Sequence, residues 1–248
     1  MKLEVHLLAC DEERIAPYTL RHYTTIASRI VVHDAMSKDR TRAICADFGV
    51  EVKDFKTDGI NDLLHKHLKE TCWKGTDADW VIVADMDEIW YFPGGLFDTL
   101  SAYDSAGIAI VKPQGFEMFS EKFPNGPGQI YDEVKQGAPE NEWYSKPNLF
   151  CPARIKSIEF SAGAHQAWGV LQDGTKWNDI KTPTEPPTFM LHCRHVCTLE
   201  EDAARYARQQ ARHSPTNKKN NFGNFEAPLK HAKDKRQKIM AGLRTIIP

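Results

Sequence analysis

The chain has 248 residues, of which 41% are hydrophobic and 27% are charged, as is ordinary for a soluble globular protein. This length can bury the core of one α/β domain or of two small ones. The formal net charge of −2 indicates no class of partner, and no apolar run approaches the ~20 residues that a bilayer-spanning helix needs.

The chain begins in a strand-like segment, residues 3–9, without the basic start, apolar run and cleavage site of a signal peptide. We therefore expect a cytoplasmic protein. The cysteines are too scattered for a disulfide framework and are predicted to be reduced core thiols: Cys10, Cys45, Cys72, Cys151, Cys193 and Cys197. The run 192–197 holds two His and two Cys, but no second pair at finger-like spacing that would favour structural zinc.

The first third of the chain alternates between strand and helix patterns. Strands are predicted at 3–9, 29–33, 50–55 and 80–84, with helices at 14–27, 37–48 and 57–72 between them. Ser37 is a candidate cap for the second helix, and the third is expected to bury Leu63, Leu64, His67 and Leu68. This alternation predicts a parallel sheet with right-handed crossovers.

Acidic residues follow three of these strands. Asp11, Asp34 and Asp85 would share the carboxyl edge of the sheet, where ligands bind in such folds. Asp85 and Asp87 lie two positions apart and could point the same way, towards Mg²⁺ or Mn²⁺ shared with substrate phosphates. The alternative is a polar turn that closes a core strand. The first strand is followed by neither a Gly-x-Gly-x-x-Gly nor a Walker loop, which argues against a dinucleotide or P-loop protein.

The second half of the chain is mostly β in pattern. A short helix over 96–100 precedes strand candidates at 107–112, 116–119, 149–151, 155–160 and 189–193, and residues 120–146 are typical of a long loop or flap. A capping box at Thr198 predicts a helix to about His213. A last helix begins near Glu226 and places these residues near one face: Leu229, Ala232, Ile239, Leu243 and Ile246.

Residues 203–244 contain eleven Lys or Arg and two acids, so this tail could face phosphates, a nucleic acid, an anionic membrane surface or only solvent.

Three segments, residues 10–13, 32–41 and 84–88, together resemble the family-two glycosyltransferases of the GT-A fold, in order and spacing, over about the first 120 residues. Asp11 departs from the more usual Asn, and no clear late Glu-Asp pair supplies a catalytic base. The resemblance implies an α/β GT-A fold, a Rossmann-like mixed sheet flanked by helices with a helical C-terminal tail. We expect one domain over 1–248, with a nucleotide-sugar half at 1–120, an acceptor-facing half at 121–198 and the basic tail at 199–248.

The resemblance also implies roles for individual residues. Asp11, Glu12 and Asp34 would contact the base and ribose of a nucleotide sugar. Asp85 would approach the ribose or the metal, and Asp87 would bind Mn²⁺ or Mg²⁺ at the diphosphate. A late-strand histidine completes the metal shell in related enzymes, and His192 fits that place before His195.

The chemistry requires a cation for the leaving phosphate and a base for the acceptor hydroxyl. Glu142 and His165 are the candidates for the base. Aromatic residues that could stack on sugars, or merely pack, are Trp143, Tyr144, Trp168 and Trp177. Lys146 is expected either to meet phosphate or to lie on the surface.

The predicted function is metal-dependent hexosyl or deoxyhexosyl transfer from a nucleotide diphosphate sugar, UDP-sugar favoured, to a glycan or other hydroxyl acceptor. Family analogy favours inversion. A sugar-phosphate nucleotidyltransferase is the alternative, although its Gly-rich basic loop is replaced here by the acidic segment 10–13. A non-catalytic sugar or nucleic-acid binder is a third hypothesis. We expect no nucleic-acid partner, and peripheral contact with a membrane stays open.

Overall fold

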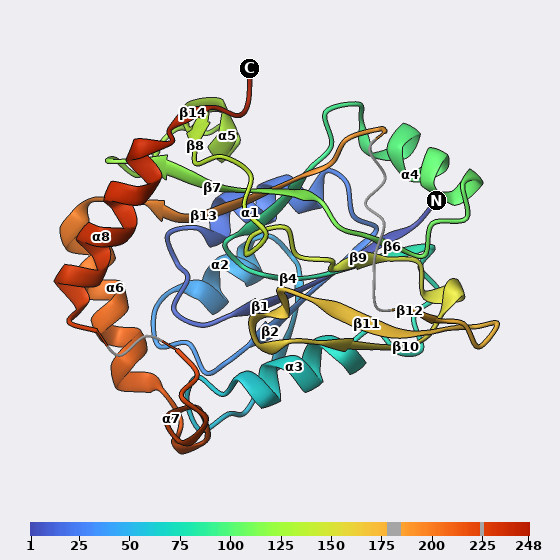
Figure 1. Ribbon diagram of the computed structural model, residues 1–248, viewed down its shortest axis with the longest axis horizontal. Coiled ribbons are helices and arrows are strands. Elements are labelled where there is room, and N and C mark those ends of the chain that lie inside the picture. The colour runs from blue at the N-terminus through green and yellow to red at the C-terminus, as the bar shows by residue number, and fades with distance from the viewer. Residues whose placement is uncertain (178–184, 224–225) are drawn as a thin grey trace.

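The computed structural model describes residues 1–177, 185–223 and 226–248 (Figure 1). The protein has the predicted mixed α/β architecture, in which helices flank sheets that contain both parallel and antiparallel strands. Over the described ranges, no helix has the length and apolar character required to cross a membrane.

The central sheet has six strands in the order β3-β2-β1-β4-β9-β6. Its members are β1 (Leu3–Ala9), β2 (Arg29–Asp34), β3 (Glu51–Asp54), β4 (Trp80–Asp85), β6 (Ile110–Val111) and β9 (Leu149–Phe150). The first four are parallel, and β9 is antiparallel to β4 and to β6. Because Ala9 pairs with Asp34 and Leu8 with Asp85, the predicted acidic residues do follow neighbouring strands at one edge.

Four helices accompany the first half of the chain: α1 (Ala16–Thr24), α2 (Thr41–Asp47), α3 (Asp62–Thr71) and α4 (Leu96–Ser105). The predicted cap at Ser37 is wrong. Helix α2 begins only at Thr41 and has no side-chain cap, because the Ser37 hydroxyl instead accepts a hydrogen bond from the Asp11 backbone N–H at 2.9 Å.

The predicted inner face of α3 is also wrong. Leu63 and Leu64 are 48% and 39% exposed and His67 is exposed, whereas Lys69 is 5% exposed. The Lys69 ammonium lies 2.7 Å from Asp85 at the end of β4, and this ion pair turns the lysine side of the helix inwards. The helix is shorter than predicted because the Asn61 side chain caps it, accepting from the Leu64 N–H.

A second sheet of five strands has the order β14-β8-β7-β13-β5. Its members are β5 (Glu88–Tyr91), β7 (Gln114–Ser120), β8 (Gln136–Gly137), β13 (Phe189–Val196) and β14 (Arg244–Thr245). Strand β13 runs between β5 and β7, so His192 is paired with Glu88 on one side and with Glu117 on the other.

A third sheet contains β10 (Ile155–Phe160), β11 (Ala167–Leu171) and β12 (Lys176–Trp177), of which only β10 was predicted. The predicted flap at 120–146 includes α5 (Ile130–Glu133) and β8, and the predicted strand at 107–112 is reduced to β6. Short 3₁₀ turns, η1 (Pro152–Arg154) and η2 (Ala162–Ala164), border β10.

Strand β4 separates two cores because its side chains alternate between the faces of the central sheet. Trp80, Ile82 and Ala84 pack in the larger core, which also contains Trp90 of the second sheet. Val81 and Val83 pack on the other face, in a smaller core that includes residues of β10. The carboxylates at the end of β4 therefore emerge from a strand fixed on both faces.

The C-terminal helices are α6 (Leu199–Arg212), α7 (Pro215–Asn220) and α8 (Pro228–Ala241). The predicted capping box of α6 is confirmed, since Thr198 and Glu201 exchange backbone-to-side-chain hydrogen bonds. Of the predicted apolar face of α8, Ala232 and Ile239 are buried, whereas Leu229 is 48% exposed.

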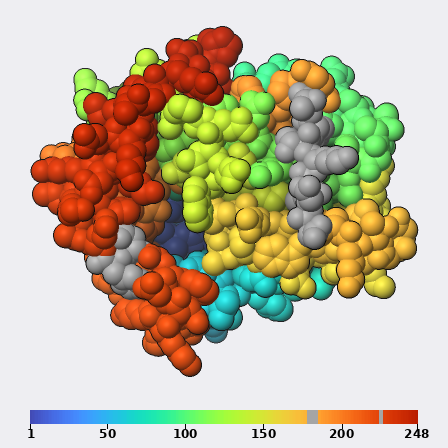
Figure 2. Space-filling model, viewed as in Figure 1, coloured from blue at the N-terminus to red at the C-terminus, as the bar shows by residue number. Residues whose placement is uncertain are grey.

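These helices flank one side of the molecule (Figure 1). Figure 2 shows a hollow between them, in red, and the yellow-green and gold segments, with blue N-terminal residues at its floor.

Candidate active site

Asp11 connects the loops that follow β1 and β2. It has a left-handed backbone conformation, with φ of 57°. Its carboxylate accepts a hydrogen bond from the Lys38 N–H at 2.7 Å and lies 3.4 Å from the Arg212 guanidinium of α6. The same guanidinium contacts the Cys10 sulfur. The C-terminal end of α6 is thus held at the carboxyl edge of the central sheet.

Asp34 is fully buried at the end of β2. One carboxylate oxygen accepts from the Ser37 N–H at 3.2 Å and from Arg42 at 2.9 Å, and Arg42 also pairs with Asp54 at 2.8 Å. The other oxygen, Oδ1, is buried without a hydrogen-bond partner among the described residues. An unpaired buried acceptor is costly, and the folded protein leaves this oxygen unsatisfied.

Asp85 lies between two buried lysines. Its carboxylate oxygens are 2.7 Å from Lys69 Nζ and 3.3 Å from Lys146 Nζ. Burial would raise the pKa of Asp85, but the two ammonium groups outweigh this effect and hold that pKa well below its usual range. Asp85 is therefore an ionised group that is already neutralised by the protein.

Lys146 is 4% exposed, so the expectation of a surface lysine is wrong. Its ammonium contacts the carboxylate of Glu88, which is fully buried and accepts a hydrogen bond from the Asp85 N–H at 3.1 Å. Asn148 adds a hydrogen bond to Glu88 at 3.4 Å. Lysine and acid thus form one buried network beneath Asp85.

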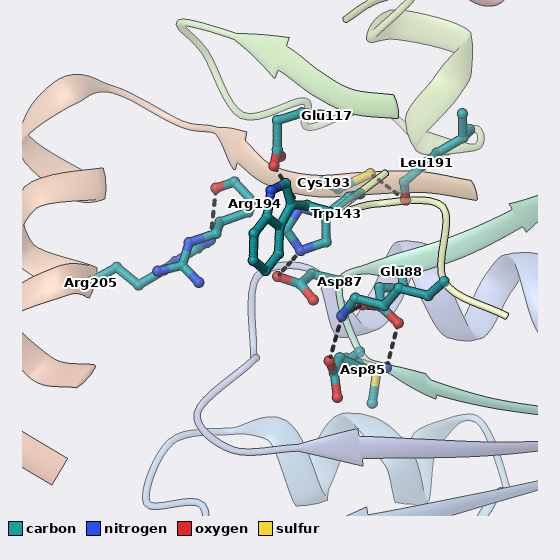
Figure 3. Close-up of polar contacts among 12 residues, drawn as sticks. Asp85, Asp87, Glu88, Glu117, Trp143, Leu191, Cys193, Arg194 and Arg205 are labelled. Atoms are coloured by element: carbon teal, nitrogen blue, oxygen red, sulfur yellow. Dashed lines mark hydrogen bonds and ion pairs between the residues drawn. The ribbon is translucent and has the colours of Figure 1, made fainter. Parts of the chain in front are cut away.

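Asp87 faces a histidine that is oriented by the carboxylate of Glu117. Figure 3 shows the two carboxylates, Asp87 and Glu117. His192 Nε2 lies 3.8 Å from the Asp87 carboxylate, and His192 Nδ1 lies 2.7 Å from Glu117. Tyr144 stacks on the imidazole, with ring centroids 5.0 Å apart. With Nδ1 donating to Glu117, Nε2 is the nitrogen that faces Asp87, as in a metal-ligand histidine with a second carboxylate behind it.

Burial and charge act on Glu117 and His192 in opposite directions. Burial would raise the pKa of Glu117, but the imidazoles of His192 and His195 lower it to about 2. Burial lowers the pKa of His192, but Glu117 and Asp87 outweigh burial, so its pKa is raised. Glu117 is therefore a permanent anion that orients the imidazole.

Glu12 lies within the electrostatic reach of Asp87. Burial and the Asp87 carboxylate raise the pKa of Glu12 to about 8, against the opposing effect of Arg205 and Arg194. Figure 3 shows Arg205 reaching from α6 towards Asp87, whereas the Arg194 guanidinium of β13 lies over the Tyr206 ring, 4.6 Å from its centroid. The Arg205 guanidinium donates to the Arg194 carbonyl at 2.7 Å. A carboxylate that burial and a neighbouring acid keep from ionising is a group that a cation would stabilise.

The two candidate bases differ in their surroundings. Glu142 is exposed on the loop before Lys146. His165 is partly buried, and its Nδ1 donates to the Trp143 carbonyl at 2.6 Å. Burial and the Lys146 ammonium lower the pKa of His165 to about 4, so its ring is neutral near pH 7 and can accept a proton.

Gly115 of β7 positions the segment 141–146. A Cβ at Gly115 would lie 2.0 Å from the Tyr144 carbonyl carbon, so only glycine permits this close approach. The Gly115 N–H donates to the Ser145 hydroxyl at 3.0 Å, and its carbonyl accepts from Asn141. This contact holds Tyr144 against His192 and Lys146 beneath Asp85.

A groove of about 570 Å³ lies elsewhere, lined by residues of 73–79, 151–156 and others, and includes neither Asp85 nor Asp87. Its Arg154 is already paired with Asp104 at 2.7 Å. We assign the chemistry to the carboxyl edge of the central sheet, here called the acidic edge. Carboxylates, cationic side chains and the imidazole of His192 converge there.

The structure thus brings Asp87 and His192 together and places Asp11, Glu12, Asp34 and Asp85 at the same edge. Residue-pattern reasoning missed the groups that support them: Lys69, Glu88, Glu117, Arg194, Arg205 and Arg212. Of these residues, only Glu117 could have been noticed from its local sequence, because it is a charged residue in the middle of a predicted apolar strand.

No protein-family profile and no curated protein matches the sequence. The structure is similar to glucosyl-3-phosphoglycerate synthase from Mycobacterium tuberculosis in complex with Mn²⁺, UDP and glucosyl-3-phosphoglycerate, with TM-score 0.35 and 21% identity over 47% of this chain and 44% of that one. It is also similar to TarS 1-349 of S. aureus, with TM-score 0.46 and 15% identity over 84% of this chain and 65% of that one. The chain spans less than two thirds of either structure.

Proposed function

We propose that this protein is a GT-A glycosyltransferase that moves a hexosyl or deoxyhexosyl group from a nucleotide diphosphate sugar to a hydroxyl acceptor, with Mn²⁺ or Mg²⁺. The observation that carries the proposal is the pairing of Asp87 with the Glu117-oriented His192. Two ligands of one octahedral ion at about 2.1 Å stand roughly 3 Å apart when adjacent and roughly 4 Å apart when opposite. The 3.8 Å between His192 Nε2 and the Asp87 carboxylate lies between these two spacings, so a small movement of the side chains would bring both atoms to one ion.

Asp87 is the carboxylate of the motif that we assign to the metal, in preference to Asp85. The Asp85 oxygens already face Lys69 and Lys146, whereas Asp87 faces only one imidazole nitrogen among the ion pairs of the described residues. Asp85 with its lysines would then form the floor under the ribose and metal. Glu12, whose pKa burial and Asp87 raise to about 8, is well placed to ionise beside a cation.

The remaining acids are proposed to bind the nucleoside. Asp34 Oδ1 is a buried acceptor that a ribose hydroxyl or a base N–H would satisfy. Asp11 holds the neighbouring loop through Lys38 and would border the same ligand. Arg205 of α6 would stabilise the charge that develops on the leaving diphosphate. UDP is the favoured diphosphate.

We propose that the acceptor is bound and deprotonated on the other side of Asp85. His165 is neutral near pH 7 and is our first candidate for the base that takes the acceptor proton, with exposed Glu142 second. Trp143 is 64% exposed next to Tyr144 and offers a face on which a sugar acceptor would stack. We propose an inverting reaction, with residues 1–120 binding the donor and 121–198 facing the acceptor.

A thermal-shift panel of UDP, GDP, dTDP and CDP, each with and without Mn²⁺, tests the proposal. Stabilisation that needs both nucleotide and metal is expected, because each ligand completes the binding site of the other. His192→Gln should abolish this joint shift, while His67→Gln, at an exposed position of α3, should retain it. Nucleotide binding that is indifferent to Mn²⁺ would support a non-catalytic binder instead.

A further inference from the structure

A second group of metal-ligating side chains lies inside the protein, away from the acidic edge. His6 and His33 are 3% and 6% exposed, and Cys72 is partly buried. His6 Nδ1 lies 3.0 Å from His33 Nε2, and one ligand atom of each of the three residues lies within 4.8 Å of the others. We call these three residues the His–Cys cluster.

The fold brings the cluster together from three elements. Strands β1 and β2 are neighbours, with His6 opposite Val31 and His33 opposite Leu8, so the two histidines lie two positions apart in register. Cys72 directly follows α3 and caps its last turn by donating its N–H to the Leu68 carbonyl. Two imidazoles and a thiol thus meet between the sheet and a helix end.

A carboxylate lies beside the first imidazole. Glu4 Oε1 is 2.7 Å from His6 Nε2 without the alignment of a hydrogen bond, and His6 Nδ1 faces His33. Glu4 is 4% exposed and is itself held by Arg29 at 3.2 Å and by the Thr76 hydroxyl at 2.8 Å. A small rotation of the ring would let Nε2 donate to Glu4, which is the arrangement found behind metal-bound imidazoles. The alternative to a metal is a hydrogen bond between His6 Nδ1 and His33 Nε2. This bond would satisfy both nitrogens but would give the Cys72 thiol no role.

We propose that the His–Cys cluster binds one Zn²⁺ ion through His6 Nδ1, His33 Nε2 and Cys72 Sγ, with a fourth position for water. In tetrahedral zinc sites the Zn–N and Zn–S bonds of about 2.0 and 2.3 Å place ligand atoms roughly 3.3 to 3.6 Å apart, so the imidazoles need to separate only slightly. Nitrogen and sulfur donors favour zinc over the hard ions assigned to Asp87.

The three side chains differ in whether they must lose a proton to bind a metal. Burial, with the neighbouring His6, lowers the pKa of His33 to about 4, and burial lowers the pKa of His6, so both rings are neutral at pH 7. Burial raises the pKa of Cys72 to about 12. The thiolate would therefore form only as the metal binds, with release of its proton to solvent.

The site would fix α3 against the sheet. Cys72 comes three residues after Lys69, whose ammonium pairs with Asp85 at 2.7 Å. Zinc at the His–Cys cluster would thus stabilise the helix that neutralises Asp85. This stabilisation does not depend on the proposed transferase reaction.

The test uses the full chain without an affinity tag, stripped of metal by a chelator, kept reduced, and titrated with Co²⁺ and then Zn²⁺. We expect one tightly held Co²⁺ with thiolate charge-transfer absorption, which Zn²⁺ displaces. Cys72→Ser should lose that absorption, and Glu4→Gln should weaken binding about 10- to 100-fold. Charge-transfer absorption that persists in Cys72→Ser, or no retained metal in the unmodified chain, would overturn the proposal.

Two control variants show which site gives rise to the cobalt absorption. His67→Ala removes an exposed histidine of the same helix, and Asp87→Asn removes the proposed Mn²⁺ ligand; both should keep the cobalt spectrum and its affinity. The zinc-induced rise in Tm is measured within each variant, so a lower starting stability cannot imitate lost binding. A spectrum that disappears in Asp87→Asn would place the metal at the acidic edge and contradict the His–Cys cluster.

Discussion

At the scale of single residues, the two aspartates of Asp85-Met86-Asp87 have different surroundings although they follow one strand. Asp85 is neutralised by two lysines, and Asp87 faces an imidazole nitrogen. The difference arises from partners far away in sequence, Lys146 on one side and His192 on the other. The motif alone therefore predicts an acidic site, while the partners decide which acid is available to a cation.

Lys146→Met should strongly destabilise the protein. It leaves the buried carboxylate of Glu88 without its cation, and breaking a buried pair costs about 3 to 5 kcal/mol. Urea unfolding measures the free energy, with Lys122→Met at an exposed site as a control expected within about 0.5 kcal/mol of the unmodified protein. Adding Glu88→Gln to Lys146→Met should recover part of the loss. A cost below about 1 kcal/mol would mean that the network is effectively solvated.

The sequence predicted the acids of the site better than their partners. Asp11, Asp34 and Asp85 follow strands, so the topology of a parallel sheet places them together. Glu117 and Lys69 lie inside elements where a charged residue is ordinarily taken to face solvent. Their burial follows from strand register and helix rotation, which local patterns do not determine.

At the scale of elements, a short segment after β8 depends on one glycine of β7. Gly115→Ala should displace residues 141–146, because the new Cβ would meet the Tyr144 backbone at 2.0 Å. We expect a loss of about 1 to 3 kcal/mol, typical of overpacking, together with weaker joint binding of nucleotide and Mn²⁺. Gly94→Ala is the matched control, since its Cβ would meet only the Thr99 hydroxyl at 3.9 Å. Equal stability of the two variants in urea would contradict the proposal that Gly115 positions residues 141–146.

Elements with strong local signals were predicted and elements without them were missed. The β-branched run of β4 and the capping box of α6 have local causes, and both elements were predicted. The inner face of α3 was misassigned because the Lys69–Asp85 pair outweighs the burial of Leu63 and Leu64. Strands β11 and β12 depend on pairing with β10 and carry little signal alone.

At the scale of the whole molecule, stability should fall as the solution is acidified from pH 6.5 to pH 4. Burial lowers the pKa of His22 to about 4 from 6.5, so the folded state prefers the neutral ring, which contacts the Trp90 carbonyl at 2.9 Å. Between these pH values the unfolded chain binds more protons, and stability that is present above pH 6.5 is lost. The shift corresponds to about 3 kcal/mol.

Urea unfolding across this pH range tests the contribution of His22. His22→Gln should reduce the slope of stability against pH by the part that His22 contributes, while His33 and His165 keep the rest; His67→Gln, at an exposed site, should leave the slope unchanged. Identical slopes for His22→Gln and the unmodified protein would show that His22 titrates alike in both states.

The central claim is that Asp87 holds a divalent cation which binds a nucleoside diphosphate at the carboxyl edge of the central sheet. Calorimetric titration of UDP with and without Mn²⁺ tests it most directly, in the unmodified chain, Asp87→Asn and the exposed control Asp98→Asn. We predict that Mn²⁺ strengthens UDP binding at least about tenfold, or about 1.4 kcal/mol, in the unmodified chain and in Asp98→Asn, and has no effect in Asp87→Asn. An equal effect of Mn²⁺ in all three proteins, or none in the unmodified chain, would contradict the claim.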